Sequence, residues 1–229
     1  MYIDPLFLED EYLNYFFKKV DYAHTDKCKI TAYAPKELLA IRGFKAEKCI
    51  LVLSGKLRVY NQFINGKNYV LEDISQGAVI GEMEAAGKWG EYTSTVEAAT
   101  EAKGLVFPHE VYISWLTNSH EFAVDAAMRL GRMMCNSSSF KGENLVFSSG
   151  LSIAMLLRRY YVENVGKGGN VIVNETRNQL SEKSGTSLRT VNRSIKTLIN
   201  LGIITIRKGK IFMDKDSFSK LVDYISENM

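Results

Sequence analysis

Residues 181–213 read SEKSGTSLRTVNRSIKTLINLGIITIRKGKIFM, and this stretch decides the fold of the C-terminal part of the chain. Gly185 can take the left-handed backbone conformation that ends a helix, and Ser187 stands where the following helix needs an N-cap. Two helices joined at a glycine, the second apolar on one side and basic on the other, are typical of a helix-turn-helix, whose second helix enters the DNA major groove. The positions expected on the buried face are Val191, Ile195, Leu198 and Ile199.

A short hairpin with a basic tip is predicted after the second helix. The run TIRKGKIFM turns at Lys208-Gly209 and would form a wing that reaches the phosphate backbone. Lys and Arg both neutralise phosphates, and Arg also binds guanine in bidentate fashion. The alternative interpretation is a solvated charged face on an ordinary helical hairpin, but the glycine, the cap, the apolar spacing and the basic wing together favour DNA binding.

The charge of the chain supports this interpretation once it is divided along the sequence. The 229 residues carry a net charge of +3. Residues 1–141 hold 16 basic and 18 acidic residues, whereas residues 142–229 hold 13 and 8. Within residues 176–210 there are eight basic residues and a single acid, Glu182. A local basic excess of this kind is what a polyanion would meet.

The remaining composition indicates an ordinary globular protein of the cytoplasm. The N-terminal sequence lacks the charged start, apolar run and cleavage site of a signal peptide. No apolar run approaches the roughly 18 residues that a membrane span needs. Cys28, Cys49 and Cys135 are odd in number and scattered, which favours reduced thiols and small buried hydrophobes over a disulfide framework.

The hydrophobic pattern predicts strands first and helices afterwards. Residues 28–107 alternate short apolar runs with glycine turns, as in an antiparallel roll, and Asn65-Gly66 is a strong hairpin signal. From Pro108 the period becomes helical. Strands followed by helices predict the α+β class, with two domains of different type.

The predicted helix over residues 120–140 is apolar on more than one side. Phe122, Ala126 and Leu130 fall near one stripe with Met133 and Met134. Other apolar positions, such as Met128, lie off that stripe, so the helix needs cover beyond a single core face. It is either a buried core helix or a helix shared with a second subunit. The residues assigned to dimerisation are Phe122, Ala126, Met128, Leu130 and Met133.

With these segments, the chain resembles the CRP/FNR family of bacterial transcription regulators over nearly its whole length. TRNQLSEKSGTSLRTVNRSIKTLINLGII resembles the winged helix-turn-helix, VIGEMEA the cyclic-nucleotide-binding roll, and SSSFKGENLVF the end of the dimer helix with its hinge. The resemblance implies a jelly-roll-like effector domain over residues 1–108, a dimerisation helix and hinge over 109–147, and a DNA-binding domain over 148–229. It also implies a homodimer on a palindromic double-stranded operator, with RNA polymerase as a further partner and no membrane.

The DNA-contacting residues follow from the same resemblance. The Arg-Glu pair that usually starts the family's recognition helix is Leu188-Arg189 here, and because Glu accepts from cytosine whereas Arg prefers guanine, the half-site should differ. Arg193 matches the family's second arginine and is the strongest candidate for a base contact, and Asn192 could read adenine. The remaining candidates are Arg177, Ser187, Thr190, Lys196, Lys208 and Lys210, of which Arg177, Ser187, Thr190 and Lys208 would mainly hold phosphates.

The effector pocket departs from the cyclic-AMP-binding members of the family. Those members carry an Arg-Ser pair after Gly-Glu, and the Arg meets the phosphate. Gly81-Glu82 is kept, but the pair becomes Tyr92-Thr93, and a tyrosine cannot supply the cation that a buried phosphate needs. Cyclic AMP is therefore not the expected effector. The residues assigned to this pocket are Gly81, Glu82, Met83, Tyr92, Thr93, Ser138 and Ser139, with Glu84 as a further possibility.

The sequence does not provide the ligand residues that an iron–sulfur cluster, a haem or a cupin-like metal site would need. An iron–sulfur cluster needs about four thiolates, and the chain has three cysteines. Haem needs an axial ligand, and the candidates His24, His109 and His120 each stand alone. A cupin-like enzyme would need a clustered set of histidines. The prediction is thus a regulator with an effector other than cyclic AMP, and the alternative is the same regulator with a non-functional pocket, controlled by a protein partner or by abundance.

Overall fold

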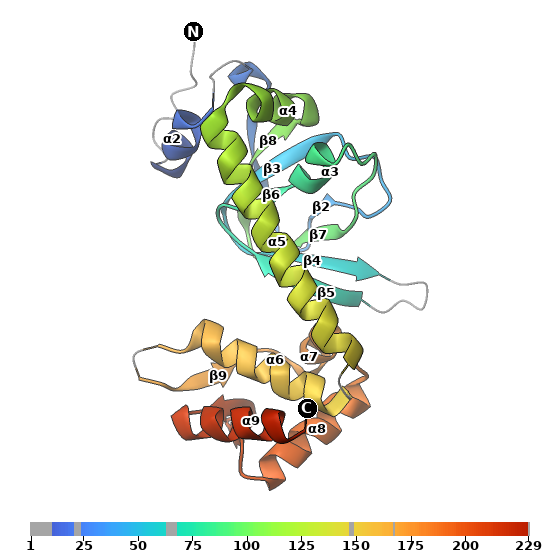
Figure 1. Cartoon of the computed structure of the whole chain (residues 1–229), viewed down its shortest axis with the longest axis vertical. Helices are drawn as coiled ribbons and strands as arrows, with labels where there is room; N and C mark the ends of the chain where they lie inside the picture. Colours follow the sequence, from blue (N-terminus) through green and yellow to red (C-terminus); the bar gives the residue numbers. More distant parts are fainter. Residues whose placement is uncertain (1–10, 21–23, 63–67, 147–148, 167, 229) are drawn as a thin grey trace. The chain divides into compact units, whose positions relative to one another are not determined.

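The computed structural model describes residues 11–20, 24–62, 68–146, 149–166 and 168–228. Contacts within the chain divide it into an N-terminal unit, Met1–Asn136, and a C-terminal unit, Ser137–Met229. The long helix α5, His120–Val146, begins in the first unit and ends in the second (Figure 1). None of the helices in the described part combines the length and apolar content that a membrane crossing requires.

The N-terminal unit is built on two antiparallel sheets of four strands each. Every pairing in both sheets is antiparallel. The pairing of β4 with β5 joins consecutive strands, and the others join strands far apart in sequence, as in a roll. The first sheet has the order β1 (Lys29–Tyr33), β8 (Ala102–Pro108), β3 (Lys48–Ser54) and β6 (Val79–Ile80). The second has the order β2 (Leu38–Ala40), β7 (Thr95–Ala98), β4 (Leu57–Gln62) and β5 (Asn68–Ile74).

Strand β3 separates two hydrophobic cores, which explains its uninterrupted run CILVL. Side chains alternate between the faces of a strand, so Ile50 and Val52 pack in the core between the sheets. Cys49 and Leu51 pack in the other core, beneath the helices. Because both faces are covered, the strand is apolar at consecutive positions rather than at alternate ones.

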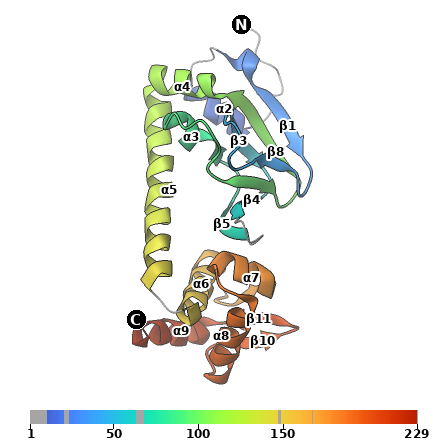
Figure 2. The same cartoon turned by 90° about the vertical axis from the view of Figure 1, so that its right-hand side faces the viewer.

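Helices cover the outer face of the first sheet (Figure 2). They are α2 (Glu11–Lys18), α4 (His109–Asn118) and the first part of α5. The 3-10 helix η1 (Thr25–Lys27) precedes β1, and its Asp26 and Lys27 are exposed. Phe16 of α2 packs edge to face on Trp115 of α4 at 5.7 Å and on Phe122 of α5 at 5.8 Å between ring centroids. This aromatic cluster fixes the start of α5 on the roll.

The C-terminal unit is a helical domain with a small sheet. Its core collects apolar residues from its four helices and from two of its strands, β9 and β11, and Tyr161 stacks on Phe218 at 4.5 Å between ring centroids. The helices are α6 (Ser149–Asn164), α7 (Arg177–Ser184), α8 (Leu188–Asn200) and α9 (Lys215–Glu227). The antiparallel sheet has the order β10 (Thr205–Arg207), β11 (Lys210–Met213) and β9 (Val171–Val173).

The predicted α+β class is confirmed: the two four-stranded antiparallel sheets end at Pro108, and most of the chain after it is helical. The predicted hairpin at Asn65-Gly66 lies outside the described residues. One predicted core position is wrong, because Ile199 is 37% exposed while Val191, Ile195 and Leu198 are buried. Ile199 follows Leu198 directly, and the 100° step between neighbouring helical residues turns its side chain to the edge of the buried stripe.

Candidate DNA-binding surface and effector pocket

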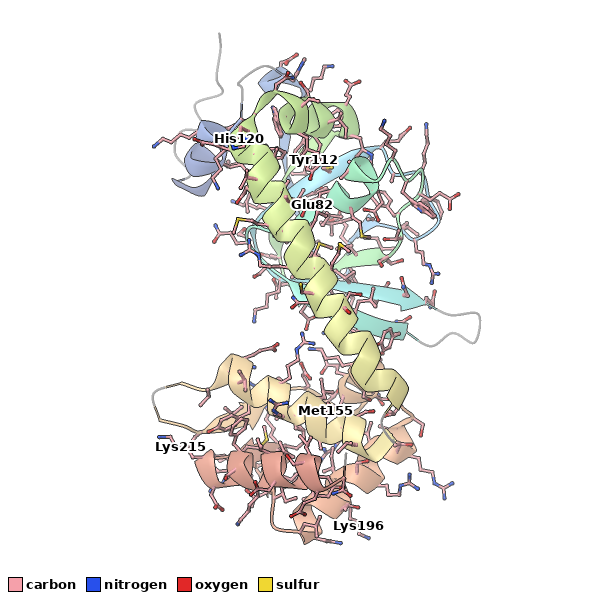
Figure 3. The ribbon with its side chains drawn as sticks, viewed as in Figure 1. Glu82, Tyr112, His120, Met155, Lys196 and Lys215 are labelled. Carbon is pink, nitrogen blue, oxygen red and sulfur yellow. The ribbon has the colours of Figure 1, made fainter. Side chains whose placement is uncertain are left out.

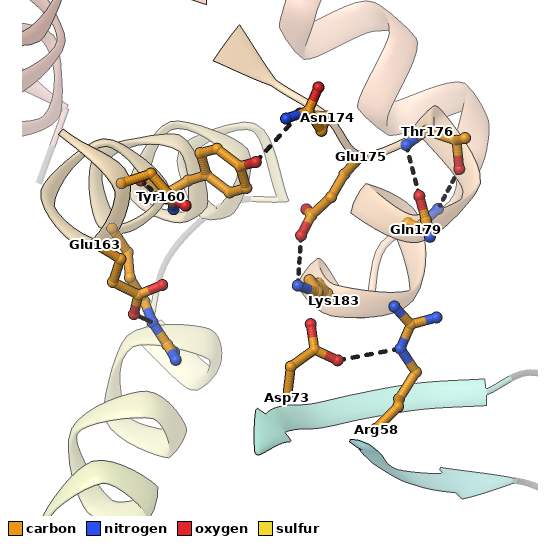
Figure 4. Close-up of polar contacts among 11 residues, drawn as sticks. Arg58, Asp73, Tyr160, Glu163, Asn174, Glu175, Thr176, Gln179 and Lys183 are labelled. Carbon is orange, nitrogen blue, oxygen red and sulfur yellow. Dashed lines mark hydrogen bonds and ion pairs between the residues drawn. The ribbon is translucent and has the colours of Figure 1, made fainter. Parts of the chain in front are cut away.

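The first helix of the helix-turn-helix, α7, is fixed at both ends by local sequence. Thr176 forms a capping box with Gln179 (Figure 4). The backbone N–H of Gln179 donates to Thr176 Oγ1 at 3.2 Å, and the backbone N–H of Thr176 donates to the side-chain Oε1 of Gln179 at 2.8 Å. Gly185 ends the helix with φ +65°, so the predicted left-handed conformation is confirmed. These two ends set the angle at which the next helix leaves.

Helix α8 begins at the predicted cap. The Thr190 amide donates to Ser187 Oγ at 3.1 Å, and the hydroxyls of Ser187 and Thr190 lie 2.9 Å apart. Val191, Ile195 and Leu198 pack in the core of the unit. The opposite face is exposed and carries Arg189, Asn192, Arg193 and Lys196.

The basic residues on this exposed face are not neutralised by the chain. Among the described residues, Arg189, Arg193 and Lys196 take part in no ion pair. Leu188, which precedes them, is 43% exposed and presents an apolar surface at the start of the helix. A row of unpaired cations on one rigid face is suited to a polyanion.

The wing has the turn geometry that its sequence predicts. Lys208 and Gly209 have φ of +48° and +77°, as in the primed turns that join two-residue hairpins. Lys208 is therefore an exposed tip. Lys210 donates from Nζ to Asn174 Oδ1 at 2.6 Å and is held against the domain, and the guanidinium of Arg207 lies over the Phe212 ring at 3.3 Å from its centroid.

Arg177, the first residue of α7, is half-buried and incompletely satisfied. Its Nη1 atom is buried with no hydrogen-bond partner among the described residues. Burial lowers the pKa of this guanidinium. Nearby in sequence, Lys183 pairs with Glu175 at 2.5 Å (Figure 4), so that lysine is engaged by the chain itself.

In the N-terminal unit, Gly81 starts the short helix α3, Glu82–Ala86, in a conformation that only glycine accommodates. Its φ is +82°, and a Cβ built at this position would lie 2.6 Å from the Lys48 carbonyl oxygen. The close approach of β3 to the start of α3 requires that this residue has no side chain. Gly81 thereby sets the position of Glu82, the first residue of α3.

Glu82 is 2% exposed and is bound by residues of two other helices. Arg129 of α5 donates from Nε to Glu82 Oε2 at 3.0 Å, and the hydroxyl of Tyr112 on α4 donates to the same oxygen at 3.2 Å. Figure 3 labels Glu82 and Tyr112 in the N-terminal unit. Burial raises the pKa of Glu82 against the opposing charge of Arg129. Arg129 also pairs with Asp125 at 2.5 Å, which in turn pairs with Lys19 at 3.3 Å.

Glu84 is also buried, at 6% exposure, and its carboxylate meets a pair of donors on one residue. Thr93 donates to Glu84 Oε1 from its amide at 2.9 Å and from its hydroxyl at 2.7 Å. No ion pair reaches Glu84 within the described part of the chain. Next to it, Tyr92 packs in the roll core, and its hydroxyl donates to the Lys48 carbonyl at 2.8 Å.

The residues predicted for the effector pocket are divided between the two units. Met83 is 44% exposed because the helical turn from Glu82 directs it outward. Lys88 is exposed in the loop after α3. Ser138 is exposed and belongs to the C-terminal unit, and the side chain of Ser139 lies outside the described residues.

Sequence reasoning missed Arg129 and Tyr112 as partners of Glu82. The available signal was the Asp125–Arg129 pair at i,i+4 spacing inside an otherwise apolar stretch, FAVDAAMRL. Charges at this spacing reinforce each other on one helix face. A charged pair on a face that otherwise packs on the roll indicates a buried partner, but the pattern does not identify Glu82.

The dimerisation residues fall on different faces of α5. Phe122 and Ala126 are buried in the core of their own unit, at 1% and 0% exposure, so their assignment to a subunit interface is wrong. Leu130 and Met133 are half-buried. Met128 is 57% exposed, and Met134 and Val124 are also exposed, at 73% and 46%.

The thiols and other metal-ligating side chains are dispersed. Among the described residues, His, Cys, Asp and Glu form no group of three or more that could hold a metal ion. Cys49 is buried, Cys28 is half-buried and Cys135 is exposed. Burial raises the pKa of the Cys28 thiol to about 12, which leaves it an inert thiol rather than a nucleophile.

Comparisons with known families identify both units. Residues 30–119 match the cyclic nucleotide-binding domain, and residues 175–205 match a winged helix-turn-helix DNA-binding family. Curated proteins give no match to the chain.

Solved structures share the fold along most of the chain at low identity. The c-di-GMP-responsive global regulator CLP of Xanthomonas campestris is 14% identical with a TM-score of 0.73, over 82% of this chain and 95% of that one. A CooA variant of Carboxydothermus hydrogenoformans is 18% identical at a TM-score of 0.72, over 87% and 88%. A CRP/FNR-family regulator of Thermus thermophilus is 20% identical at 0.68, over 85% and 98%. With both domains matched in this order, the chain has the domain composition and the fold of the CRP/FNR family of DNA-binding transcription regulators.

Proposed function

We propose that the chain regulates transcription as a homodimer that binds an inverted-repeat operator through α8. The observation that carries this proposal is the exposed face of α8, on which Arg189, Arg193 and Lys196 have no ion-pair partner among the described residues. A closed two-fold dimer presents one recognition helix per subunit, so its half-sites lie about one helical turn apart. The exposed Met128 and its neighbours Val124 and Met134 on α5 support a second subunit as their cover.

The roles of the individual residues follow from their placement. Arg193, Arg189 and Asn192 read base edges from the exposed face of α8, because Arg suits guanine and Asn suits adenine. Arg177 holds a phosphate from the first position of α7, where helix N-terminal amides also favour an anion. Lys208 at the wing tip contributes charge, and the hydroxyls of Ser187 and Thr190 contact the backbone. Contact with RNA polymerase is part of the same proposal.

Selection of duplexes from a random library by the full chain tests the DNA-binding proposal. The expected result is enrichment of an inverted repeat with two-fold symmetry and a centre-to-centre spacing of about one helical turn. Binding without sequence enrichment, or enrichment of a single unrepeated site, would contradict it.

We propose that cyclic AMP is not the effector of the N-terminal unit. Tyr92 stands where a cation would be needed, and its hydroxyl is committed to the Lys48 carbonyl. The buried carboxylates of Glu82 and Glu84 would repel a phosphate. Calorimetry with cyclic AMP should therefore give no saturable heat, and a complex of micromolar or tighter affinity would contradict the proposal.

The remaining choice lies between a different small effector and a pocket without one. The hydrogen bonds from Thr93 to Glu84 favour the second alternative, in which a protein partner or the abundance of the chain sets its activity, because these donors are already occupied. A thermal-shift screen of neutral and cationic metabolites separates the two, since a ligand of the native state raises the melting temperature by mass action.

A further inference from the structure

Thr93 presents an anion-binding pair of donors to the interior of the N-terminal unit. Its amide and its hydroxyl both point at one carboxylate oxygen, at 2.9 and 2.7 Å. Two converging donors on one residue are an arrangement suited to an oxyanion. Thr93 directly follows Tyr92, which packs in the core of the roll.

The anion that occupies these donors belongs to the chain itself. Glu84 reaches them from α3 and is 6% exposed, so its carboxylate is withdrawn from water. Burial of an unpaired charge is costly unless hydrogen bonds compensate it. Thr93 supplies that compensation, and no ion pair of the described residues does so.

A second carboxylate fixes the same short helix to α5. Glu82 binds Arg129 of α5, whose side chain is 14% exposed, and Tyr112 of α4. Helix α3 is thus attached on one side to the loop at Thr93 and on the other to α5.

We propose that Glu84 is a resident anion: it fills the donor pair of Thr93 in place of a bound phosphate or carboxylate, and it holds α3 in one position without any small molecule. The proposal rests on the proposed regulatory function of the N-terminal unit. Its consequence is that DNA binding needs no added anionic effector. Removal of the Glu84 carboxylate leaves a vacancy that a free carboxylate can fill.

Chemical rescue of the full chain carrying Glu84→Ala tests this proposal. In sodium chloride the melting temperature should fall by about 5–10 °C, because two charge-assisted hydrogen bonds are lost. Sodium acetate at equal ionic strength should restore most of that loss and leave the wild type unchanged. Glu84→Gln, whose side chain still fills the space, should not respond to acetate. Glu91→Ala removes an exposed carboxylate of the same loop and is the matched control.

Thr93→Val, which keeps the shape and removes the hydroxyl donor, tests the same contact without opening a vacancy. It should lower the melting temperature by a few degrees and should not respond to acetate. A wild-type melting temperature for Thr93→Val, or a destabilised Glu84→Ala that acetate and inorganic phosphate both fail to restore, would overturn the proposal.

Affinity for the selected duplex separates this proposal from the proposed function. Wild-type chain should bind the duplex without any added small molecule, and acetate should restore the affinity that Glu84→Ala loses. If the wild type binds no DNA but acetate still rescues the melting temperature of Glu84→Ala, the proposed function fails and the resident anion stands. If the wild type binds DNA only after a phosphate-bearing molecule is added, the proposal that Glu84 is a resident anion is wrong.

Discussion

In the N-terminal unit the carboxylates of Glu82 and Glu84 are buried and bound by the chain itself, whereas Arg189 and Arg193 on α8 are exposed and have no ion-pair partner among the described residues. The first pattern contributes to the stability of the fold, and breaking it leaves an uncompensated buried charge. The second contributes little to stability and is free to meet phosphates and bases. Removal of a charge should therefore lower the stability of the first region, whereas in the second region it should lower DNA affinity and leave stability nearly unchanged.

The largest effect is expected from Arg129→Ala. It leaves the buried Glu82 without its cation and should lower the free energy of unfolding of the N-terminal unit by about 3 kcal/mol. Urea unfolding monitored by tryptophan fluorescence measures this, since Trp115 lies in the core beside α5. Adding Glu82→Gln to this variant should recover part of the loss. Arg132→Ala, on an exposed position of the same helix, should change the free energy of unfolding by less than about 0.5 kcal/mol. An equal loss of stability in Arg129→Ala and Arg132→Ala would argue against a stabilising ion pair between Arg129 and Glu82.

The next effect concerns the α5 surface. Met128→Glu places a charge on the face proposed for the second subunit and should weaken the dimer by about 2–3 kcal/mol, or roughly a hundredfold in dissociation constant. Analytical ultracentrifugation over a concentration series measures the shift. Met83→Glu, a change of the same kind on the exposed side of α3, should leave the dimer intact. A wild type that stays monomeric at micromolar concentration would remove the basis of this prediction.

Arg193→Ala should affect DNA recognition and leave stability unchanged. We expect a loss of about 1–3 kcal/mol on the selected duplex, with weaker discrimination at one base pair. Fluorescence anisotropy on specific and scrambled duplexes measures both quantities. Lys220→Ala, a surface charge on α9 that pairs with Asp216, serves as the control. An equal loss on both duplexes would make Arg193 a phosphate contact and transfer the reading role to Arg189 or Asn192.

The smallest effect is expected from Lys208→Ala at the wing tip. It should weaken binding to all sequences alike and lower the slope of log affinity against log salt by about one unit. A salt series on specific and scrambled duplexes provides the measurement. Lys36 is an exposed lysine of the N-terminal unit that also has a positive φ, +72°, so Lys36→Ala controls for the backbone change. A sequence-dependent loss for Lys208→Ala would place this residue in a groove instead.

The DNA-binding half could be predicted from the sequence because its determinants are local. Gly185 and Ser187 act on the residues beside them, and the apolar spacing of α8 is visible within a few turns. The predicted effector pocket was harder, since Arg129 and Glu82 are 47 positions apart and meet only in the folded roll. For the same reason, the stripe that contains Phe122 and Ala126 did not reveal that their own unit covers it.

Strand β3 determines how the N-terminal unit unfolds. Its residues belong alternately to the core between the sheets and to the core beneath the helices. Neither core can open while the other stays closed, because both share this strand as a wall. Amide hydrogens of residues 49–53 should therefore exchange with solvent only through complete opening of the unit, and report its global rather than local free energy.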